Sequence, residues 1–436
     1  MPAAYPWLSP ASSDVSLTSS TGLFRLVGGG LAVVISCLVH DVAQGGDDAR
    51  AFGVAFAVLD TGGNASDLGL VLTASVIATI AFLLVGGVVA DRFSRRGVML
   101  GSDTLRCAAQ GAFAVLVLMG HPPLWALIGL SAVGGAGTGL FSPALTAVTT
   151  EVVRADDLHD ANVLLGMAKN IGIIAGPAVA GALIAVTSAG VVVAIDAATY
   201  AVSVISLALL HFEISPRGVA RSKLDDLRDG WGAWTARPWI WITDIKFALF
   251  NAVVYAPLLV LGPAVARARL GGATPWGLIL TAQGAGAVVA GLALIGRRPS
   301  RPLVVITIAQ AAWALPLAGL ALLLPVPVIA AGAFAAGIGS ATFFAIWTTT
   351  LQRNVPPRLL ARVSSFDYLS SFAFAPIGLA VVGPIASALG SSTLLWIGAS
   401  WQILSTIVVL ALPQIRDFRD PAKSSTVLGV GAGIPL

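Results

Sequence analysis

The chain has 436 residues, of which 57% are hydrophobic and 11% are charged, and its mean hydropathy is +0.89. A soluble domain carries roughly 25% charged residues because its surface faces water, so this composition excludes an ordinary soluble protein. The net charge of +4 would suit nucleic acid, but the basic residues stand in short clusters between apolar runs, as in the loops of membrane proteins. A lipid bilayer is the expected partner, and nucleic acid is not.

The apolar runs predict about twelve membrane-spanning helices, since a helix needs about 20 apolar residues to cross about 30 Å of hydrocarbon. In chain order they are expected within 23–59 and over 68–90, 98–119, 123–149, 161–187, 189–211, 239–265, 275–296, 302–323, 326–350, 362–388 and 391–412. The first run is too long for one span, so its helix either begins near Leu31 or breaks at Gly45 and Gly46.

The polar stretch 213–238 divides the helices into six plus six, and weak echoes between the two sets predict related halves. The expected fold is all-α and integral to the membrane, with two pseudo-symmetric six-helix bundles over 23–212 and 239–413. The polar stretch is expected to be a cytoplasmic linker, with a short interfacial helix anchored by its tryptophans. A disordered cytoplasmic tail, 1–22, and a second cytoplasmic tail, 414–436, complete the chain.

Charge asymmetry predicts the orientation. With both termini in the cytoplasm, most basic residues fall in inner segments and the outer loops are short and nearly uncharged, as the positive-inside rule requires. Arg267 and Arg269 are the exceptions. The Arg-, Ala- and Gly-rich composition is typical of a GC-rich bacterial genome, so a multi-pass protein of the bacterial inner membrane is expected.

The sharpest local motif reads G-G-V-V-A-D-R-F-S-R-R and lies between the second and third expected helices. Its marked members are Gly86, Gly87, Asp91, Arg92, Arg95 and Arg96. The glycines allow a neighbouring helix to approach, and the aspartate can accept hydrogen bonds from the free amides of a helix N-terminus.

This motif resembles the signature loop of the major facilitator superfamily. The resemblance implies that the aspartate meets the eleventh helix near Arg362. It also implies that the arginines hold acidic partners, with Glu151 the candidate, and that these contacts lock the inward-closed state. An ordinary basic loop is the alternative interpretation.

A second motif lies in the fifth helix and is similar to the antiporter motif of exporters in the same superfamily. Its members are Gly172, Gly176, Pro177 and Gly181. Small residues at every fourth position permit close helix contact, and the proline removes a backbone hydrogen bond and bends the helix. Ala180 replaces the first of the family's paired glycines. The resemblance implies efflux by proton exchange, and tight packing alone is the alternative.

Further segments extend the resemblance over nearly the whole chain, toward the macrolide- and siderophore-exporter branch of the superfamily. They are Ser102–Arg106, Asp160–Gly166, Lys169-Asn170 and Pro356–Asp367. One departure matters, because the arginine that many drug–proton antiporters place early in the fourth helix is absent and Ser131 stands in that region. Proton coupling must therefore use other groups.

Charges inside the membrane are the coupling candidates, since each costs about 2.5–3.5 kcal/mol at the bilayer centre on insertion scales. They are Asp47, Asp48, Arg50, Asp103, Arg106, Lys169, Asp196, Asp244, Lys246 and Asp367. Asp103, Asp244 and Asp367 are expected near cytoplasmic helix ends, where snorkelling or structural pairing is the simpler interpretation.

Asp47 lies about 18 Å along a helix from Leu59, near mid-membrane. Asp47 or Asp48 is therefore the favoured proton-titrating carboxylate, with Lys169 or Arg106 as its counter-charge. A structural ion pair is the alternative.

The substrate path is expected to be lined by polar and aromatic residues in the middle of the second-half helices. The candidates are Asn251, Tyr255, Gln283, Phe344 and Trp347. For the aromatic residues, packing against lipid or neighbouring helices is the alternative.

The sequence has no phosphate-binding glycine loop and no Cys/His metal spacing, so no cofactor, no metal and no enzymatic activity are expected. The sequence thus predicts a monomeric secondary transporter that exports amphipathic small molecules in exchange for protons. Two alternatives stay open, which are proton-coupled uptake and a transport-inactive membrane sensor or assembly protein.

Overall fold

The computed structural model describes residues 46–92, 94–120, 122–152, 172, 175–209, 230–297 and 299–419. Every regular element within these residues is helical. The segment 1–22, the first part of the run 23–59, most of the linker and residues 420–436 lie outside the described residues. Nine helices or helix runs of the described part are long and apolar enough to cross a membrane, which agrees with the predicted all-α membrane fold.

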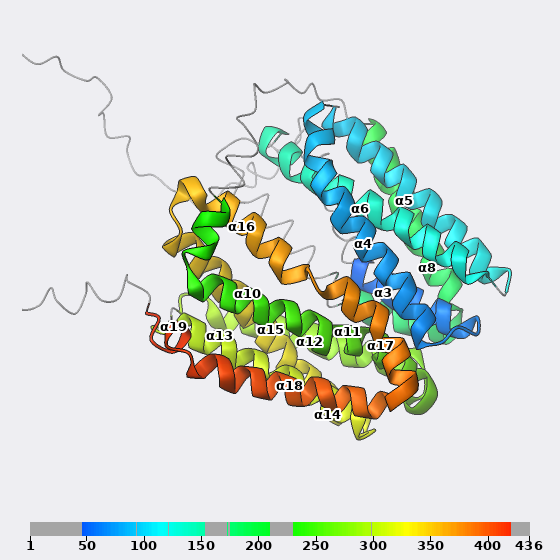
Figure 1. Cartoon of the computed structure of the whole chain (residues 1–436). Coiled ribbons are helices and arrows are strands. Elements are labelled where there is room, and N and C mark those ends of the chain that lie inside the picture. The colour runs from blue at the N-terminus through cyan, green and yellow to red at the C-terminus, as the bar shows by residue number, and fades with distance from the viewer. Residues whose placement is uncertain are drawn as a thin grey trace, which may run out of the picture.

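The helices of the first half are α3 (Gly46–Asp60), α4 (Ala65–Arg92), α5 (Arg95–Leu118), α6 (Leu124–Val152), an apolar helix Ala175–Val186, and α8 (Ala189–Leu209). Four of these helices match the expected spans within a few residues, and α3 and the helix Ala175–Val186 are the described parts of the first and fifth spans. α5 contains two arginines in its first turn and two charges in its middle, yet its 24 residues reach about 36 Å. It packs between α6 and α8 (Figure 1).

The second half continues with shorter pieces because several spans are interrupted. Its helices are α10 (Pro238–Phe250), α11 (Ala256–Val265), α12 (Ala273–Leu294), α13 (Pro302–Gln310), α14 (Ala314–Ala321), α15 (Val326–Asn354), α16 (Pro357–Phe372), α17 (Ala375–Leu389), α18 (Ser391–Ala411) and α19 (Pro413–Arg416). The seventh span consists of α10 and α11, the ninth of α13 and α14, and the eleventh of α16 and α17. A short helical segment, 230–235, precedes α10.

Prolines account for these interruptions, because proline lacks an N–H group and its ring collides with the carbonyl four residues earlier. In the seventh span a π-helical turn, Asn251–Tyr255, stands directly before Pro257. In the ninth span a 3₁₀ turn precedes Pro316, and in the eleventh the helix stops just before Pro376. The predicted spans were drawn as continuous helices, so these breaks refine the prediction.

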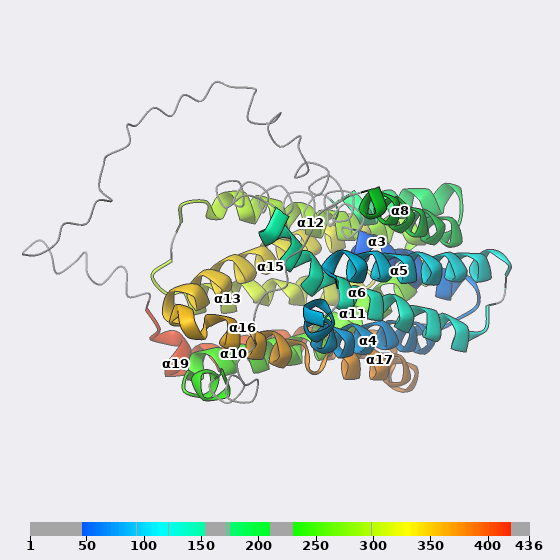
Figure 2. The same cartoon turned by 90° about the horizontal axis from the view of Figure 1, so that it is seen from above.

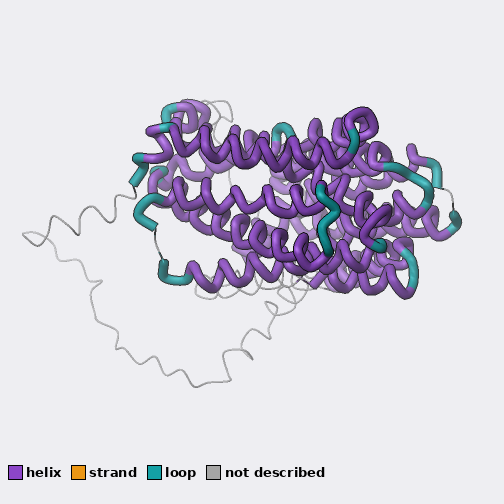
Figure 3. Tube along the Cα trace, turned by 90° about the horizontal axis from the view of Figure 1, so that it is seen from below, coloured by secondary structure: helices purple, strands orange, loops and turns teal. Residues whose placement is uncertain are grey.

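The antiparallel helices give the bundle two ends, at which most loops gather (Figure 3). The basic end is defined by the helix termini that carry Arg96, Arg237, Arg301, Arg353, Arg362 and Arg416. The short-loop end is defined by the connections 61–64, 119–123, 187–188, 271–272, 322–325 and 390. The two halves come together toward the short-loop end and spread apart toward the basic end (Figures 1 and 2).

Glycines make the contact between the halves at the short-loop end. A Cβ atom placed on Gly69 of α4 would lie 2.4 Å from the Leu379 carbonyl oxygen of α17, and one on Gly383 would lie 2.2 Å from Cα of Ser66. Backbones this close leave no room for a side chain, which is how small residues drive helix association in membranes.

A second glycine contact joins the fifth span to α12. A Cβ atom on Gly277 would lie 2.7 Å from the Pro177 carbonyl oxygen, whereas one on Gly291 of the same helix would meet nothing within 4 Å. The two glycines therefore offer a matched pair for testing this contact.

We expect Gly277→Ala to destabilise the short-loop closure by about 1–3 kcal/mol, since overpacking forces backbones apart. The measurement is thermal unfolding of the detergent-purified chain, together with disulfide formation between cysteines introduced at Asp60 and Arg267. Gly291→Ala is the control and should be neutral or mildly stabilising, because alanine favours helices. Equal behaviour of the two variants would contradict the contact.

Candidate functional site

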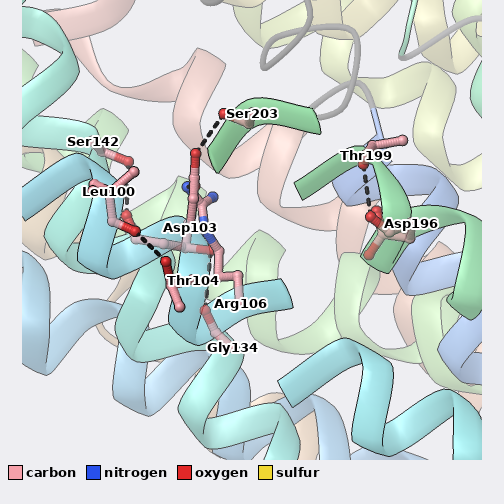
Figure 4. Close-up of polar contacts among 10 residues, drawn as sticks. Leu100, Asp103, Thr104, Arg106, Gly134, Ser142, Asp196, Thr199 and Ser203 are labelled. Atoms are coloured by element: carbon pink, nitrogen blue, oxygen red, sulfur yellow. Dashed lines mark hydrogen bonds and ion pairs between the residues drawn. The ribbon is translucent and has the colours of Figure 1, made fainter. Parts of the chain in front are cut away.

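A buried charge cluster lies inside the first half, between α5, α6 and α8 (Figure 4). The Arg106 guanidinium donates to the Asp103 carboxylate one turn before it on α5, and the Ser203 hydroxyl of α8 donates to the same carboxylate at 2.6 Å. Asp103 and Arg106 are 0% and 1% exposed. The guanidinium also lies over two rings, 4.5 Å from Phe141 and 4.8 Å from Tyr200, a cation–π arrangement that adds to the pairing.

A polar contact connects the third and sixth spans in each half. In the first half, the Gln110 amide donates to the Asp196 carboxylate at 2.7 Å. In the second half, Gln402 donates to the Gln310 backbone carbonyl at 2.7 Å, and Lys246 donates to the Gln310 side chain at 3.0 Å. All five residues are buried, so these polar groups lie within the bundles.

The contacts of Arg106 test one of the two counter-charges that the sequence suggests for Asp47 or Asp48. Arg106 was expected to neutralise Asp47 or Asp48, and its described carboxylate partner is Asp103. Asp47 and Asp48 lie in the first turn of α3, but their side chains are outside the description. Lys169 lies outside the described residues altogether. The role of Asp47 or Asp48 in proton transfer therefore stays a prediction.

The gating motif occupies the end of α4 and the start of α5. Gly86, Gly87, Asp91 and Arg92 belong to the last turns of α4, Arg95 begins α5, and Glu151 lies at the end of α6. Their side chains lie outside the description. The side chain of Arg96 is described, and it donates to the Leu207 and Ala208 carbonyl oxygens at 3.0 and 2.6 Å.

An acidic partner was expected for Arg96, but these two contacts cap the free carbonyls at the end of α8 instead. α4 meets the eleventh span through α17. The expected contact of Asp91 with the start of α16 stays a prediction.

The antiporter motif lies at the junction of the halves. Gly181 packs on α12, where a Cβ atom would lie 3.2 Å from the Ala273 carbonyl oxygen, and its own carbonyl accepts a hydrogen bond from Thr274 at 3.2 Å. Pro177 is the residue whose carbonyl faces Gly277. Gly172 is buried, and Gly176 lies in the same apolar helix as Pro177. The motif thus helps to close the short-loop end, as its small residues predict.

An ion pair also crosses between the halves at this end. The Arg267 guanidinium, at the end of the seventh span, lies 2.9 Å from the carboxylate of Asp60, the last residue of α3. Both side chains are more than two-fifths exposed, so the pair contributes little by itself. It explains why Arg267 departs from the predicted charge asymmetry, because its partner holds it at the short-loop end.

A pair of carboxyl groups joins the seventh and eleventh spans on the basic side. Asp244 of α10 and Asp367 of α16 lie beside each other, close enough for each carboxyl group to act on the other electrostatically. The Trp234 indole donates to Asp244 at 2.7 Å and the Trp347 indole donates to Asp367 at 2.9 Å. The Ser370 hydroxyl lies 3.0 Å from Asp244.

We call Asp244 and Asp367 the carboxyl pair. Because ionised carboxylates are acceptors only, a hydrogen bond between the two groups would require a proton on one of them. The sequence placed both residues near helix ends and favoured snorkelling or structural pairing, and the structure shows that their partner is each other. No spacing in the sequence indicated this, since the two residues lie more than 120 positions apart.

A set of aromatic rings adjoins the carboxyl pair. Phe247 of α10 stacks on Phe343 of α15 at 4.9 Å and meets Phe344 at 5.9 Å and Phe372 of α16 at 6.1 Å. Tyr368, next to Asp367, extends the set through Phe372 at 4.7 Å. Phe344 and Tyr368 are 52% and 49% exposed. We call these five residues the aromatic wall.

Phe344 is directed toward the interior. On α15, Gly337 touches the Gln283 carbonyl of α12, while Trp347 packs against Trp239 of α10. Successive residues of a helix are rotated by about 100° around its axis, so the Phe344 side chain points in a direction between those of Gly337 and Trp347. Its exposed surface therefore faces the space bounded by α10 and α12 rather than the outer surface.

The other substrate-path candidates have different surroundings. Asn251 is 4% exposed and donates to the Phe247 and Ser371 carbonyls at 3.2 and 3.0 Å, so it joins the π-helical turn to α16. Tyr255 packs against Phe250 and Trp313. Trp347 is 5% exposed and faces the carboxyl pair. Of the five candidates, Phe344 has the most exposed ring, and Gln283 is partly buried.

Comparison with known proteins places this geometry among transporters. The sequence profile of the Major Facilitator Superfamily matches residues 17–379. The multidrug efflux pump Tap of Mycolicibacterium fortuitum is 26% identical over 383 residues, which cover 83% of this chain and 90% of the relative. Macrolide efflux protein A of Streptococcus pyogenes is 23% identical over 363 residues, which cover 79% of this chain and 87% of the relative.

Solved structures resemble the fold at lower identity. The crystal structure of the nucleoside transporter NupG has a TM-score of 0.70 at 15% identity and covers 87% of this chain and 97% of its own. A bacterial homologue of the iron transporter ferroportin, solved in an inward-facing state, has a TM-score of 0.66 at 18% identity and covers 87% of this chain and 98% of its own. At these identities the likeness concerns the fold alone.

We expect the Asp103–Arg106 pair to be a structural element. Arg106→Met or Asp103→Asn alone should destabilise the protein by about 3–5 kcal/mol, because each leaves a buried charge without its partner. The double variant should recover a large part of this loss. The measurement is thermal unfolding of all four forms in a double-mutant cycle, and additive losses would contradict the pairing.

Proposed function

The chain belongs to the Major Facilitator Superfamily, and from that premise we propose that it is a proton-coupled exporter of amphipathic small molecules. The observation that carries the proposal is the carboxyl pair beside the aromatic wall, on the side where the two halves spread apart. The pair offers a site for a proton, and the wall offers rings on which an apolar or cationic molecule can lie. Relatives named as multidrug and macrolide efflux proteins support the direction of transport.

We propose that the basic end faces the cytoplasm, in the plasma membrane of a bacterium. Arginines at helix termini of this end support the orientation through the positive-inside rule. The contacts between halves at the short-loop end then close the outer side, so that the exposed rings are reached from the cytoplasm. Alternating access requires these outer contacts to open while the motif Gly86–Arg96 closes the inner side.

The carboxyl pair gives the proposal a chemical step. With one proton, the two neighbouring groups can share a hydrogen bond that holds α10 and α16 together. Loss of that proton leaves two anions facing each other in a poorly solvated place, where like charges repel strongly. We propose that this repulsion separates α10 from α16 and so links proton release to the change of state. Asp47 or Asp48 is a second proposed proton carrier, in the other half.

Proton-coupled uptake is the first alternative, and the Gly176-Pro177 motif, which resembles the antiporter motif of exporters, disfavours it. A membrane sensor or assembly protein without transport is the second, and the retention of several charges inside the spans disfavours it. We propose that the chain acts as a monomer with no cofactor and no catalytic activity, because both halves needed for alternating access lie in one polypeptide.

Efflux measurements test the proposal. Asp244→Asn and Asp367→Asn should each lower uncoupler-sensitive efflux of ethidium and of erythromycin by at least about tenfold, since the proton can no longer be shared and released. The assay compares cells that express these variants, Asp47→Asn and the unaltered chain, with and without an uncoupler.

Asp417→Asn is the matched control. The hydrogen bond from Arg416 lowers the pKa of Asp417, so this exposed carboxylate stays ionised and its removal should leave efflux unchanged. Uncoupler-insensitive efflux in the unaltered chain would overturn proton coupling. Full uncoupler-sensitive efflux in both Asp244→Asn and Asp367→Asn would remove the carboxyl pair from the mechanism and favour Asp47.

A further inference from the structure

Two tryptophans from different elements converge on the carboxyl pair. Trp234 belongs to the helical segment 230–235, which precedes the second half, and Trp347 belongs to α15. Each indole donates its N–H to a different carboxyl group. The indole N–H is a donor only, so each ring fixes one oxygen of its carboxyl group as an acceptor.

Both rings are held in place by packing. Trp347 stacks on Phe343 at 6.1 Å and meets Trp239 edge-on at 5.7 Å, and it is 5% exposed. Trp234 packs on Trp231 at 5.3 Å, and Trp231 meets Phe366 of α16 at 5.8 Å. A tryptophan has two side-chain torsions, and with the ring wedged in this way its N–H direction is fixed.

The segment 230–235 is itself docked tightly on α16. Gly230 is buried, and a Cβ atom there would lie 2.8 Å from the Phe366 ring and 3.1 Å from the Arg362 Cβ atom. The Trp234 donor therefore arrives on a segment whose position is fixed relative to Asp367 as well as to Asp244.

The third possible donor is less specific. The Ser370 hydroxyl has one hydrogen but three acceptors within reach, which are Asp244 at 3.0 Å, the Phe366 carbonyl at 2.7 Å and the Asp367 carbonyl at 3.1 Å. A single hydrogen serves one of them at a time. The indoles are thus the donors committed to the carboxyl groups.

Other charged groups on the surrounding elements are engaged elsewhere or lie outside the pair. On α10, Lys246 donates to Gln310 of α13. Next to the segment 230–235, Arg237 donates to the Ala233 carbonyl, and on α19 Arg416 pairs with exposed Asp417. On α16, Arg362 lies against Gly230 and Tyr368 is half exposed. Each carboxyl group of the pair has the other as its charged neighbour.

We propose that Trp234 and Trp347 are the positioning residues of the proton site: their N–H groups turn the two carboxyl groups toward each other so that one proton serves both. This inference rests on the proposed function and adds the residues that set the affinity for the proton. Since an N–H donor stabilises the ionised form of a carboxylate, the indoles also allow the proton to leave.

The test is an infrared titration of the protonated carboxyl band, measured on the full chain in lipid, which needs no transported substrate. Asp244→Asn and Asp367→Asn identify the band of the pair. Trp234→Phe and Trp347→Phe keep most of the ring packing and remove the donor. Each should move the titration midpoint to higher pH by about one pH unit, because a lost charge-assisted hydrogen bond favours the protonated form.

Trp231→Phe is the matched control, since Trp231 lies in the same segment and packs against Trp234, and the carboxyl pair receives its indole hydrogen bonds from Trp234 and Trp347. The titration midpoint of the carboxyl band in Trp231→Phe should stay unchanged. If Trp347→Phe fails to fold, Trp234→Phe, with its partly exposed ring, decides the test.

An unchanged midpoint in Trp234→Phe, with the band still lost in Asp244→Asn, would overturn the inference and leave the proposed function standing. Absence of any band that depends on Asp244 or Asp367 would instead overturn the proton site itself, and with it the inference.

Discussion

The cost of a polar group in hydrocarbon is the constraint on which this structure depends. Every buried charge that is described has a partner, whether an opposite charge, an amide or another carboxyl group. Arg106 meets Asp103 on the same helix, and the other partners come from different spans, so satisfying those charges also fixes how the spans pack. Asp103 draws α5 and α8 together through Ser203, and Lys246 draws α10 toward α13. Polar contacts therefore supply specificity where contact between apolar faces cannot, because lipid is as apolar as leucine.

The two halves satisfy this constraint in different ways. In the first half the acidic Asp103 meets the basic Arg106, so each buried charge has an opposite charge as its partner. In the second half Asp244 lies beside Asp367, and two carboxyl groups can hydrogen-bond to each other only when one of them carries a proton. The same need for partners thus yields a pair of opposite charges in one bundle and a pair of acidic groups in the other. The sequence favours coupling in the first half, and the proposed function adds the carboxyl pair of the second half as a proton site.

Small residues and prolines set the remaining geometry. Glycines at the short-loop end let backbones of opposite halves touch, while the basic side is bordered by large aromatic rings that hold α10, α15 and α16 together. Proline interrupts the seventh, ninth and eleventh spans. The break before Pro376 separates α17, which contacts the first half, from α16, which bears Asp367. Such a break allows one part of a span to move while the other stays in contact.

The sequence by itself determined the all-α membrane fold and the order of the described spans, with approximate ends for most of them, because apolar length and charged loops are local properties of the chain. It also identified the superfamily, since the motif from Gly86 to Arg96 and the Gly-Pro motif of the fifth helix are contiguous. Only the tertiary structure decided which buried charges meet. Asp244 and Asp367 belong to different spans, and Trp234 and Trp347 to two further elements, so their convergence depends on helix rotation and tilt. A hydropathy pattern does not encode those angles, because the packing of whole helices against one another sets them.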